Sequence, residues 1–348
     1  MKACLLKEYG HFEWNDVPDP EIKADEVLVK TTYASICGSD QHIFLGEFHP
    51  RTQLPLIPGH EFTGTIVATG SDVNDVSIGD RVAIDPIIWC GTCPACQINH
   101  YPACTSLKLL GVDLNGGFGE YVVTKPYMLY PLTSNISDIH GSLIEVFGIG
   151  FHACNRAGLE SGNTVAIWGT GKVGHCILQA VKTKTSDQIF LIDLMDERLN
   201  KAKEAYPDVI IINPLRTDPV QIIHEYTHGR GVDIAFEAAG HDASKGQTIN
   251  PVRGCINVIR GAGKVCVLGL GDDPAPVVFK ELIWKESTII ASRVSHGEFA
   301  EVIENMDKGH LKPDVLISDV FSANRIQEAF ETLEKTPEKH LKILLSFQ

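Results

Sequence analysis

The chain has 348 residues, of which 44% are hydrophobic, and a formal net charge of -14 at pH 7. This length exceeds what one hydrophobic core usually organises, so we expect about two domains. The acidic balance argues against nucleic acid or an anionic membrane as a partner, because both are bound through clustered Lys and Arg.

The start of the chain, MKACLLKEYG, lacks the apolar segment of a signal peptide, and no apolar run of about 18 residues occurs that would span a bilayer. We therefore expect a cytoplasmic protein, in which thiols stay reduced. The ten cysteines are then expected to be metal ligands or buried apolar groups rather than disulfides.

The first part of the chain is predicted to form short β-strands. Segments 26–36, 62–70 and 80–88 are rich in β-branched residues and are bounded by Gly, Asp and Pro, which is typical of strands in an irregular domain. This pattern predicts a strand-rich first domain over residues 1–150.

Four cysteines fall within one short segment of this domain. Cys90, Cys93, Cys96 and Cys104 have the spacing C-x2-C-x2-C-x7-C, and four thiolates that one loop wraps around an ion make a closed tetrahedral Zn²⁺ site. An iron–sulfur cluster is the chief competitor, since ferredoxins use a similar run, and a disulfide pair is a third reading. We favour structural zinc because no second cysteine run exists and the following domain is suited to hydride transfer.

From about residue 151 apolar strands alternate with amphipathic helices. This alternation predicts crossover units in a parallel sheet that is covered on both faces, which is a doubly wound α/β domain over residues 151–295. The predicted strands are 163–169, 188–194, 209–213, 232–240, 263–270 and 287–294, and the predicted helices are 172–184, 195–206 and 219–231.

The segment GTGKVG follows the first of these strands and opens a helix, which predicts a dinucleotide-binding loop. Gly169 permits the tight turn, Gly171 lets the backbone approach a pyrophosphate, and Gly174 lets the helix pack on the sheet. Lys172 and Val173 complete the loop as cofactor-binding candidates.

Asp193 lies at the end of the second strand of this domain, close to the expected separation of about 20 residues from the loop. There it would accept hydrogen bonds from the adenosine ribose and repel a 2′-phosphate, so NAD is favoured over NADP. Arg198 is the one nearby hint of NADP tolerance, although an ordinary helix charge explains it equally well. Gly269, in a later strand, is a further cofactor-binding candidate.

The C-terminal part is predicted to contain helices over 298–309 and 325–335 and a strand over 340–347. We expect this strand to return to the first domain. Residues from about 296 to 348 would then complete the first domain, and the nucleotide-type domain would be an insertion in it.

A second set of chemically active residues is scattered through the first domain. Singly, each has an ordinary explanation: a small buried cysteine, a turn-capping serine, a core or surface histidine, an exposed carboxylate. Their joint occurrence with the cysteine loop and the nucleotide fold indicates an open metal site. They are Cys37, Ser39, His42, His60, Glu61 and Glu145.

The motifs ICGSD-x-H, GHEFTG, the cysteine loop, GVDLNGGFGEY and GTGKVG occur in the order typical of the zinc-dependent medium-chain dehydrogenases. The chain resembles this family over almost its whole length, and within it the branch of sorbitol, threonine and hexonate 5-dehydrogenases, which includes the starvation-sensing B-type and L-galactonate dehydrogenases. Ser292 and Arg293 match the Ser-Arg of that branch and join the cofactor-binding candidates. The resemblance implies a GroES-like catalytic domain, a Rossmann domain, a catalytic and a structural zinc ion, and NAD.

The resemblance also implies that Cys37 and His60 ligate the catalytic zinc, with Glu145 at the third protein position and Glu61 beside the metal. The branch usually has Glu-Pro at the third ligand, whereas Val146 follows Glu145 here. Because a proline would fix the turn that aims the carboxylate, Glu61 remains a serious alternative ligand.

The implied reaction is the oxidation of a secondary alcohol to a ketone. An open zinc site lowers the pKa of a bound hydroxyl, and the alkoxide carbon releases hydride to NAD. By resemblance, Ser39 takes the hydroxyl proton and passes it through the nicotinamide ribose to His42, which acts as the exit base.

The substrate candidates follow from the resemblance and from one cationic residue. By resemblance, Phe44, Phe48, Leu114 and Phe118 are candidate cleft residues, although aromatic residues more often belong to a core. Arg293 would meet a carboxylate in bidentate fashion, which suits a hexonate such as L-galactonate, L-gulonate or L-idonate, but a contact with the cofactor is an equal alternative. A sorbitol- or iditol-type polyol dehydrogenase and an L-threonine 3-dehydrogenase are further alternatives.

Two rivals from other classes are a non-catalytic NAD(H)-binding regulatory protein and a zinc-free enoyl or quinone reductase. The presence of Cys37, His60 and both glutamates opposes the first, and the GHE motif and the cysteine loop oppose the second. We expect a homodimer or homotetramer, in which residues 274–283 (PAPVVFKELI) form a seam between Rossmann domains or a buried run within one chain.

Overall fold

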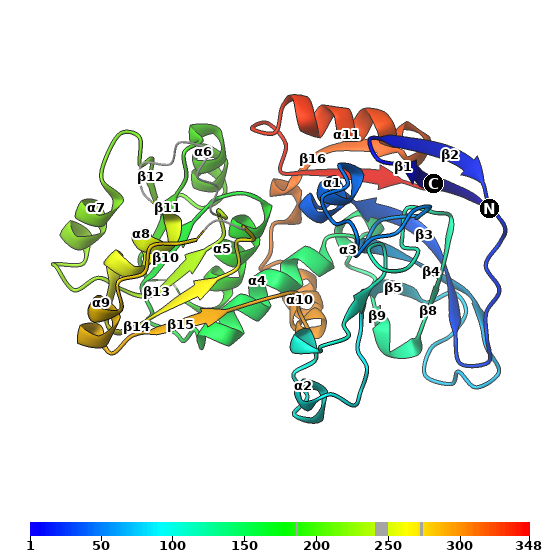
Figure 1. Ribbon diagram of the computed structural model, residues 1–348, viewed down its shortest axis with the longest axis horizontal. Helices are drawn as coiled ribbons and strands as arrows, with labels where there is room; N and C mark the ends of the chain where they lie inside the picture. The colour runs from blue at the N-terminus through cyan, green and yellow to red at the C-terminus, as the bar shows by residue number, and fades with distance from the viewer. Residues whose placement is uncertain (186, 241–249, 272–273) are drawn as a thin grey trace. The chain divides into compact units, whose positions relative to one another are not determined.

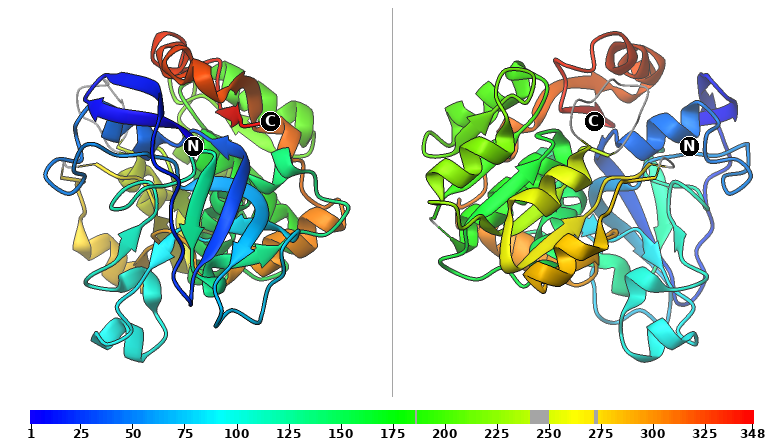
Figure 2. Two further views of the ribbon diagram at one scale, coloured as in Figure 1. Left: turned by 90° about the vertical axis from the view of Figure 1, so that its right-hand side faces the viewer. Right: turned by 60° about the vertical axis from the view of Figure 1, so that its left-hand side comes forward.

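The computed structural model describes residues 1–185, 187–240, 250–271 and 274–348. The chain divides into two compact units (Figure 1). The first comprises Met1–Val146, Ser295–Gly309 and Leu316–Gln348, and the second comprises Phe147–Val294 and His310–Val315. Both ends of the chain belong to the first unit (Figure 2).

The first unit is built on a seven-stranded sheet of order β16-β17-β3-β4-β5-β9, with β8 also paired to β3, and two further strand pairs, β1-β2 and β6-β7. Its strands are β1 (Lys2–Glu8), β2 (His11–Asp16), β3 (Val27–Ser35), β4 (Glu61–Thr69), β5 (Arg81–Ile84), β6 (Ile87–Ile88), β7 (Lys108–Leu109), β8 (Tyr121–Thr124), β9 (Leu129–Pro131), β16 (Ile317–Ser322) and β17 (Lys342–Ser346). Its helices are α1 (Gly38–Phe44), α2 (Pro94–Gln97), α3 (Asp138–Gly141), α10 (Glu298–Asp307) and α11 (Ile326–Lys335), with short 3-10 turns η1 (Tyr101–Ala103), η2 (Pro126–Met128) and η5 (Ala323–Arg325).

Three strands of this sheet meet where the candidate metal ligands lie. β3 ends at Ser35, which is opposite Glu61 at the start of β4 in their antiparallel pairing. On its other side Ser35 is opposite Leu344 of β17, the last strand of the chain. The end of β3, the start of β4 and the start of β17 therefore lie side by side, although they are far apart in the sequence.

The second unit is a six-stranded parallel sheet of order β12-β11-β10-β13-β14-β15. In chain order this is the 3-2-1-4-5-6 arrangement of dinucleotide-binding domains. Its strands are β10 (Val165–Trp168), β11 (Ile189–Ile192), β12 (Ile210–Ile212), β13 (Val232–Glu237), β14 (Ile259–Val267) and β15 (Thr288–Ala291). The helices are α5 (Lys172–Lys184), α6 (Asp196–Ala205), α7 (Pro219–Tyr226), α8 (Pro251–Val258) and α9 (Phe279–Lys285), with η4 (Pro313–Val315).

Helices α5 and α6 cover one face of this sheet and α7, α8 and α9 cover the other (Figure 1). The doubly wound arrangement predicted from the alternating pattern is therefore confirmed. The central strands β10 and β11 are buried on both faces, which explains why they are uniformly apolar.

Helix α4 (Ile144–Ala157) runs from the first unit into the second, and the sequence did not predict it. Its first turns are almost wholly buried, so they lack the polar face by which an amphipathic helix is recognised. Gly148 and Gly150 also weaken its helical signal. Gly150 is needed for packing, because a Cβ there would lie 2.6 Å from the backbone of Cys176 in α5.

The predicted strand 232–240 ends early, at Glu237 of β13. The carboxylate of Glu237 accepts hydrogen bonds from the backbone N–H groups of Ala239 and Gly240, which folds the next residues into a turn. The predicted helix 219–231 likewise stops at Tyr226. Within the described ranges, no helix is both long and apolar enough to cross a membrane.

Candidate active site

The sheet of the first unit brings Cys37, His60 and Glu61 together. Cys37 is the N-cap residue of α1, directly beyond β3, and the other two residues stand at the start of the neighbouring strand β4. One ligand atom from each lies within 4.8 Å of the others. His60 and Glu61 are buried, so three metal-binding groups of different chemistry converge in a site that is largely shielded from water.

Asp40 supports two of these groups from the first turn of α1, and the sequence analysis did not identify it. Its Oδ2 accepts a hydrogen bond from the backbone N–H of Cys37 at 2.8 Å, and its Oδ1 lies 3.4 Å from Nδ1 of His60. This contact leaves Nε2 of His60 for a metal. Burial opposes protonation of His60, but the charges of Asp40 and Cys37 raise the pKa of His60 well above its usual value.

Lys342 is the second residue that the sequence analysis missed. It opens β17, is fully buried, and donates hydrogen bonds to both carboxylate oxygens of Glu61 and, at 3.4 Å, to the carbonyl of Ile36. Burial alone would raise the pKa of Glu61, but the ammonium group of Lys342 lowers it. The only sequence signal was one lysine in the otherwise apolar run KILL.

Glu145, the second residue of α4, is buried near this cluster but does not belong to the group whose ligand atoms all lie within 4.8 Å of one another. Among the residues that the structure describes, its Oε2 has no hydrogen-bond partner. Burial, and then the negative charge of Glu61, raise the pKa of Glu145 well above its usual value. A buried carboxylate in this state fits a site that is completed by a cation.

The thiol of Cys37 is affected by the same charges. Burial and Glu61 oppose its ionisation, but the positive charges of His60 and Lys342 lower the pKa of Cys37. A sulfur, an imidazole nitrogen and a carboxylate are the donor set of open zinc sites, and the residues present therefore fit such an ion.

Helix α1 carries the two candidate proton-transfer residues. The thiol of Cys37 donates to Oγ of Ser39 at 3.9 Å, so this serine lies beside the cluster. His42, in the last turn, is exposed and its Nδ1 is hydrogen-bonded to Glu47. The structure thus brings Ser39 to the candidate ligands and leaves His42 at the protein surface.

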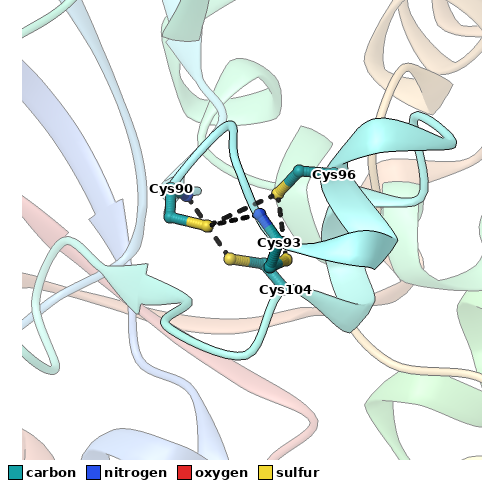
Figure 3. Close-up of side chains that lie close together, drawn as sticks. All are labelled: Cys90, Cys93, Cys96 and Cys104. Carbon is teal, nitrogen blue, oxygen red and sulfur yellow. Dashed lines mark hydrogen bonds between the residues drawn. The ribbon is translucent and has the colours of Figure 1, made fainter.

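The four clustered cysteines form a separate group in the segment that contains α2 (Figure 3). Their sulfur atoms all lie within 4.8 Å of one another, and Sγ of Cys96 lies 3.9 Å from Sγ of Cys90 and 3.5 Å from Sγ of Cys93. All ten cysteines are free thiols, so the disulfide reading of this segment is wrong. The side chains point toward one centre, as four ligands of a single ion would.

The backbone around this cluster favours thiolates at Cys90 and Cys93, whereas burial and the neighbouring cysteines raise the pKa of Cys96 to about 12. N–H groups of Cys96 and Thr105 lower the pKa of Cys93 to about 6, and Cys90 Sγ accepts a hydrogen bond from the N–H of Cys93 at 3.4 Å. The thiolate is the form that binds metals, so Cys90 and Cys93 are suited to bind a cation.

The glycine loop of the second unit has the conformation that a phosphate-binding turn requires. Gly169 has a φ of +90° and a Cβ there would lie 2.7 Å from the backbone of Ala239, whereas a Cβ on Gly174 would lie 1.8 Å from the carbonyl oxygen of Gly169. Gly171, the N-cap of α5, has open space around it, and the nearest atom to a Cβ would be Nη1 of Arg198 at 3.7 Å. Within the part of the chain that the structure describes, the absence of close atoms around Gly171 is what the approach of a dinucleotide pyrophosphate to this helix N-terminus requires.

Asp193 follows β11 and lies against the same loop. Its Oδ2 accepts hydrogen bonds from N–H and Oγ1 of Thr170 at 2.7 and 3.0 Å, and its Oδ1 accepts one from the N–H of Met195 at 2.9 Å. These contacts fix the carboxylate beside the loop. Thr170, inside GTGKVG, was not singled out by the sequence analysis.

The remaining cofactor candidates lie beyond the carboxyl ends of the parallel strands, the edge at which such sheets bind ligands. Lys172 and Val173 open α5. Gly269 follows β14 and donates to the buried carboxylate of Glu237 at 3.1 Å, and Ser292 follows β15 and donates to the carbonyl of Val267 at 3.0 Å. Arg293, the next residue, is exposed.

The four aromatic and aliphatic residues expected in a substrate cleft have different environments. Phe118 is fully buried, and Phe44 packs in the core with Phe12 and Phe330. These two were wrong as cleft residues, because their rings are needed to fill the first unit. Phe48 stacks on His42 and Leu114 is 42% exposed.

Comparison with known families gives two matches along the chain. Residues 23–134 match the family described as alcohol dehydrogenase GroES-like domain. Residues 173–308 match the family described as zinc-binding dehydrogenase.

Curated relatives match over nearly the whole chain. The starvation-sensing protein RspB of Escherichia coli (strain K12) is 31% identical, with 100% of this chain and 99% of the relative covered. A sorbitol dehydrogenase of Bacillus subtilis (strain 168) is 30% identical, with 99% and 97% covered. A 2-dehydro-3-deoxy-L-galactonate 5-dehydrogenase of Pseudoalteromonas atlantica is 26% identical, with 91% and 90% covered.

Solved structures are similar over the same length. RspB from E. coli CFT073, an alcohol dehydrogenase complexed with NADH, has a TM-score of 0.90 at 30% identity, with 100% of this chain and 99% of that chain covered. L-idonate 5-dehydrogenase from E. coli K-12 has a TM-score of 0.87 at 25% identity, with 99% and 98% covered.

Proposed function

The chain belongs to the family of zinc-binding alcohol dehydrogenases with a GroES-like domain, and on this premise we propose that it oxidises a secondary alcohol of a sugar acid to the ketone, with zinc and NAD as cofactors. The observation that carries the proposal is the convergence of the thiol of Cys37, the imidazole of His60 and the carboxylate of Glu61 in the first unit, with Glu145 buried nearby. The predicted family and fold class are confirmed, and the residue roles below are proposals.

Cys37, His60 and Glu145 are the proposed ligands of the catalytic zinc. Glu61 is the weaker candidate for the third position, because its charge is already balanced by Lys342. Glu145 has a buried oxygen without a hydrogen-bond partner in the described part of the chain, and a ligand role would satisfy it. Zinc held there would act as a Lewis acid that lowers the pKa of the substrate hydroxyl.

The other residues of the site orient the ligands or transfer the proton of the substrate. Asp40 orients the imidazole of His60, and Lys342 keeps Glu61 in place beside the ligands. Ser39 takes the hydroxyl proton of the substrate, and His42 acts as the exit base that delivers a proton to solvent.

Cys90, Cys93, Cys96 and Cys104 are the proposed ligands of a structural zinc. Four sulfur ligands leave no position for substrate, so this ion would stabilise the loop rather than take part in the reaction. The absence of other cysteine groupings among the described residues supports zinc over an iron–sulfur electron-transfer chain.

NAD, which accepts the hydride, is the proposed cofactor of the second unit. Gly169, Gly171 and Gly174 shape the loop, with Lys172 and Val173 beginning the helix. Asp193 is fixed where its charge would repel a 2′-phosphate. Among the similar solved structures, one is complexed with NADH and another is bound to NADP. Arg198 near Gly171 would weaken this preference for NAD over NADP. Gly269 and Ser292 are the proposed contacts at the far end of the cofactor, and Arg293 is the alternative contact there if it does not pair with the substrate.

A hexonate is the proposed substrate class. Relatives described as acting on 2-dehydro-3-deoxy-L-galactonate and L-idonate support it, and exposed Arg293 could pair with a carboxylate. A polyol is the alternative, which the sorbitol dehydrogenase relative favours, and relatives that act on L-threonine keep that substrate in consideration.

The experiment that tests this function is a screen of NAD reduction. L-Galactonate, L-gulonate, L-idonate, sorbitol and L-threonine are compared at equal concentration, with zinc quantified in the same preparation. We expect the highest kcat/KM with a hexonate. A higher kcat/KM with sorbitol would identify a polyol, rather than a hexonate, as the substrate class. If a zinc-loaded preparation reduces no NAD with any of the five compounds, the proposed activity is wrong.

We also propose that two copies pair through the sheet of the second unit. In the described chain β15 pairs with β14 alone, so one edge of the strand is open. Beside it α9 exposes Phe279, Ile283 and Trp284 by 72%, 73% and 74%. An open edge strand flanked by large apolar side chains suits a second copy related by a twofold axis.

A Trp284→Glu variant tests this interface. The mass measured by light scattering should shift from dimer to monomer, or from tetramer to a smaller species, and an unchanged mass contradicts the proposed interface.

A further inference from the structure

A carboxylate lies against the histidine that we propose as the exit base. Nδ1 of His42 is hydrogen-bonded to Oε2 of Glu47, five residues later. We infer that Glu47 is a positioning residue for the reaction: it holds the ring of His42 in one orientation and in one tautomer. The inference rests on the proposed function, because it assigns Glu47 a role through His42.

The backbone fixes the two residues next to each other. The N–H of Glu47 donates to the carbonyl of His42 at 2.9 Å, which closes the turn after α1. Gly46 within this turn has a φ of +82°, and a Cβ there would lie 2.9 Å from the ring of Tyr9. The turn therefore needs glycine at this position, and its geometry delivers the carboxylate of Glu47 to the imidazole.

Phe48 restricts the rotation of the His42 ring by stacking against it. The two rings are parallel within 1° and their centroids are 5.9 Å apart. Rotation of the imidazole would break both this stacking and the hydrogen bond to Glu47. The histidine is thus held by two neighbours, although its side chain is 53% exposed.

The chemistry of the pair defines the tautomer. An ionised carboxylate only accepts hydrogen bonds, so Nδ1 of His42 must carry the hydrogen and Nε2 must keep its lone pair. When the substrate proton arrives, a bond forms between that proton and Nε2, and the resulting imidazolium is stabilised by the adjacent carboxylate. The Nε2–H bond then breaks to release the proton to water, and Glu47 ends as it began.

The ion pair contributes little to folding, which makes its functional role testable. Both side chains are about half exposed, 53% and 54%, and pairs of this kind stabilise a protein by less than about 1 kcal/mol. Variants at Glu47 should therefore fold normally. A loss of activity in them would report on His42 rather than on damage to the fold.

The test uses Glu47→Ala, which removes the acceptor, and Glu47→Gln, which keeps a neutral acceptor. In ¹⁵N spectra of the zinc-loaded protein, His42 should be the Nδ1–H tautomer in the natural chain and shift toward Nε2–H in Glu47→Ala. The transient rate of NADH formation should fall about three- to fivefold in Glu47→Ala and less in Glu47→Gln, with KM for NAD unchanged. In a His42→Asn background the same substitutions should have no further effect.

The matched control is Asp319→Asn, which removes a carboxylate 3.4 Å from Nε2 of His340, a histidine–carboxylate pair elsewhere in the same unit. It should leave both the His42 spectrum and the rate unchanged. The inference is overturned if Glu47→Ala keeps the Nδ1–H tautomer, or if it slows the His42→Asn enzyme equally. If His42→Asn itself has the full natural rate, the exit-base role in the proposed function is wrong and the inference falls with it.

Discussion

The ammonium group of Lys342 is hydrogen-bonded to both carboxylate oxygens of Glu61, 281 residues away in the sequence and fully buried. Two buried charges are tolerated in this way only when they are paired with good geometry. The pair lies directly beside Cys37 and His60. The carboxylate of Glu61 therefore already has a cationic partner, Lys342. Among the residues that the structure describes, Oε2 of Glu145 has no hydrogen-bond partner, and this difference from Glu61 underlies the ligand set that we propose.

Replacing Lys342 with Met should strongly destabilise the protein. The substitution leaves Glu61 buried without its partner, which costs about 3–5 kcal/mol of unfolding free energy. The freed carboxylate should also compete with substrate at the metal and reduce kcat roughly 10- to 100-fold. Denaturant unfolding and steady-state kinetics of the zinc-loaded variant measure the two effects.

The double variant Lys342→Met/Glu61→Gln is the control for this prediction. It removes both charges, so it should recover most of the lost stability. If the single variant is as stable as the natural chain, Lys342 and Glu61 do not form the buried pair described here.

Glu145→Gln and Glu61→Gln form a matched pair that distinguishes the two carboxylates. Gln is neutral and a poor zinc ligand, so Glu145→Gln should weaken zinc binding at the open site by more than about 100-fold. Glu61→Gln should change zinc affinity far less, because Glu61 is already engaged by Lys342. Competition with a chromophoric chelator measures both, and the reverse ranking would assign the third ligand to Glu61.

Replacing Cys96 with Ser should affect folding rather than chemistry. A structural zinc contributes folding free energy, so the midpoint of thermal unfolding should fall by roughly 5–10 °C and the zinc content by about half. Cys176→Ala, at a buried cysteine of α5, should retain all the zinc. Unchanged zinc content and thermal midpoint in Cys96→Ser would exclude a metal cage formed by the four cysteines.

The substrate proposal predicts a selective effect of Arg293→Leu. If the guanidinium pairs with the carboxylate of a hexonate, kcat/KM for L-galactonate should fall roughly 10- to 100-fold. The value for sorbitol, which has no carboxylate, should change much less. Equal losses on both substrates, together with a raised KM for NAD, would identify Arg293 as a cofactor contact instead.

The sequence predicted best what depends on local spacing. The four cysteines lie within one loop, so their spacing alone brings the sulfur atoms together. The glycine loop is likewise defined by a strand, a turn and a helix in immediate succession. The alternation of apolar strands and amphipathic helices was sufficient for the doubly wound fold class.

Contacts that depend on strand pairing across the whole chain were not predictable. Lys342 reaches Glu61 only because β17 pairs with β3, and β3 with β4, and one lysine in an apolar strand does not encode its partner. Asp40 was overlooked although it lies inside a recognised motif, because its role follows from the turn geometry of α1. The uniformly buried start of α4 hid the helix that carries Glu145.

The most direct test of the central claim is crystallography of the zinc-loaded protein with anomalous data collected on both sides of the zinc absorption edge. We expect one zinc peak between the sulfur atoms of Cys90, Cys93, Cys96 and Cys104. A second peak should lie within about 2.0–2.3 Å of Cys37 Sγ, a His60 ring nitrogen and a Glu145 oxygen. A fully loaded protein with no peak at Cys37 and His60 would contradict the proposed zinc-dependent oxidation.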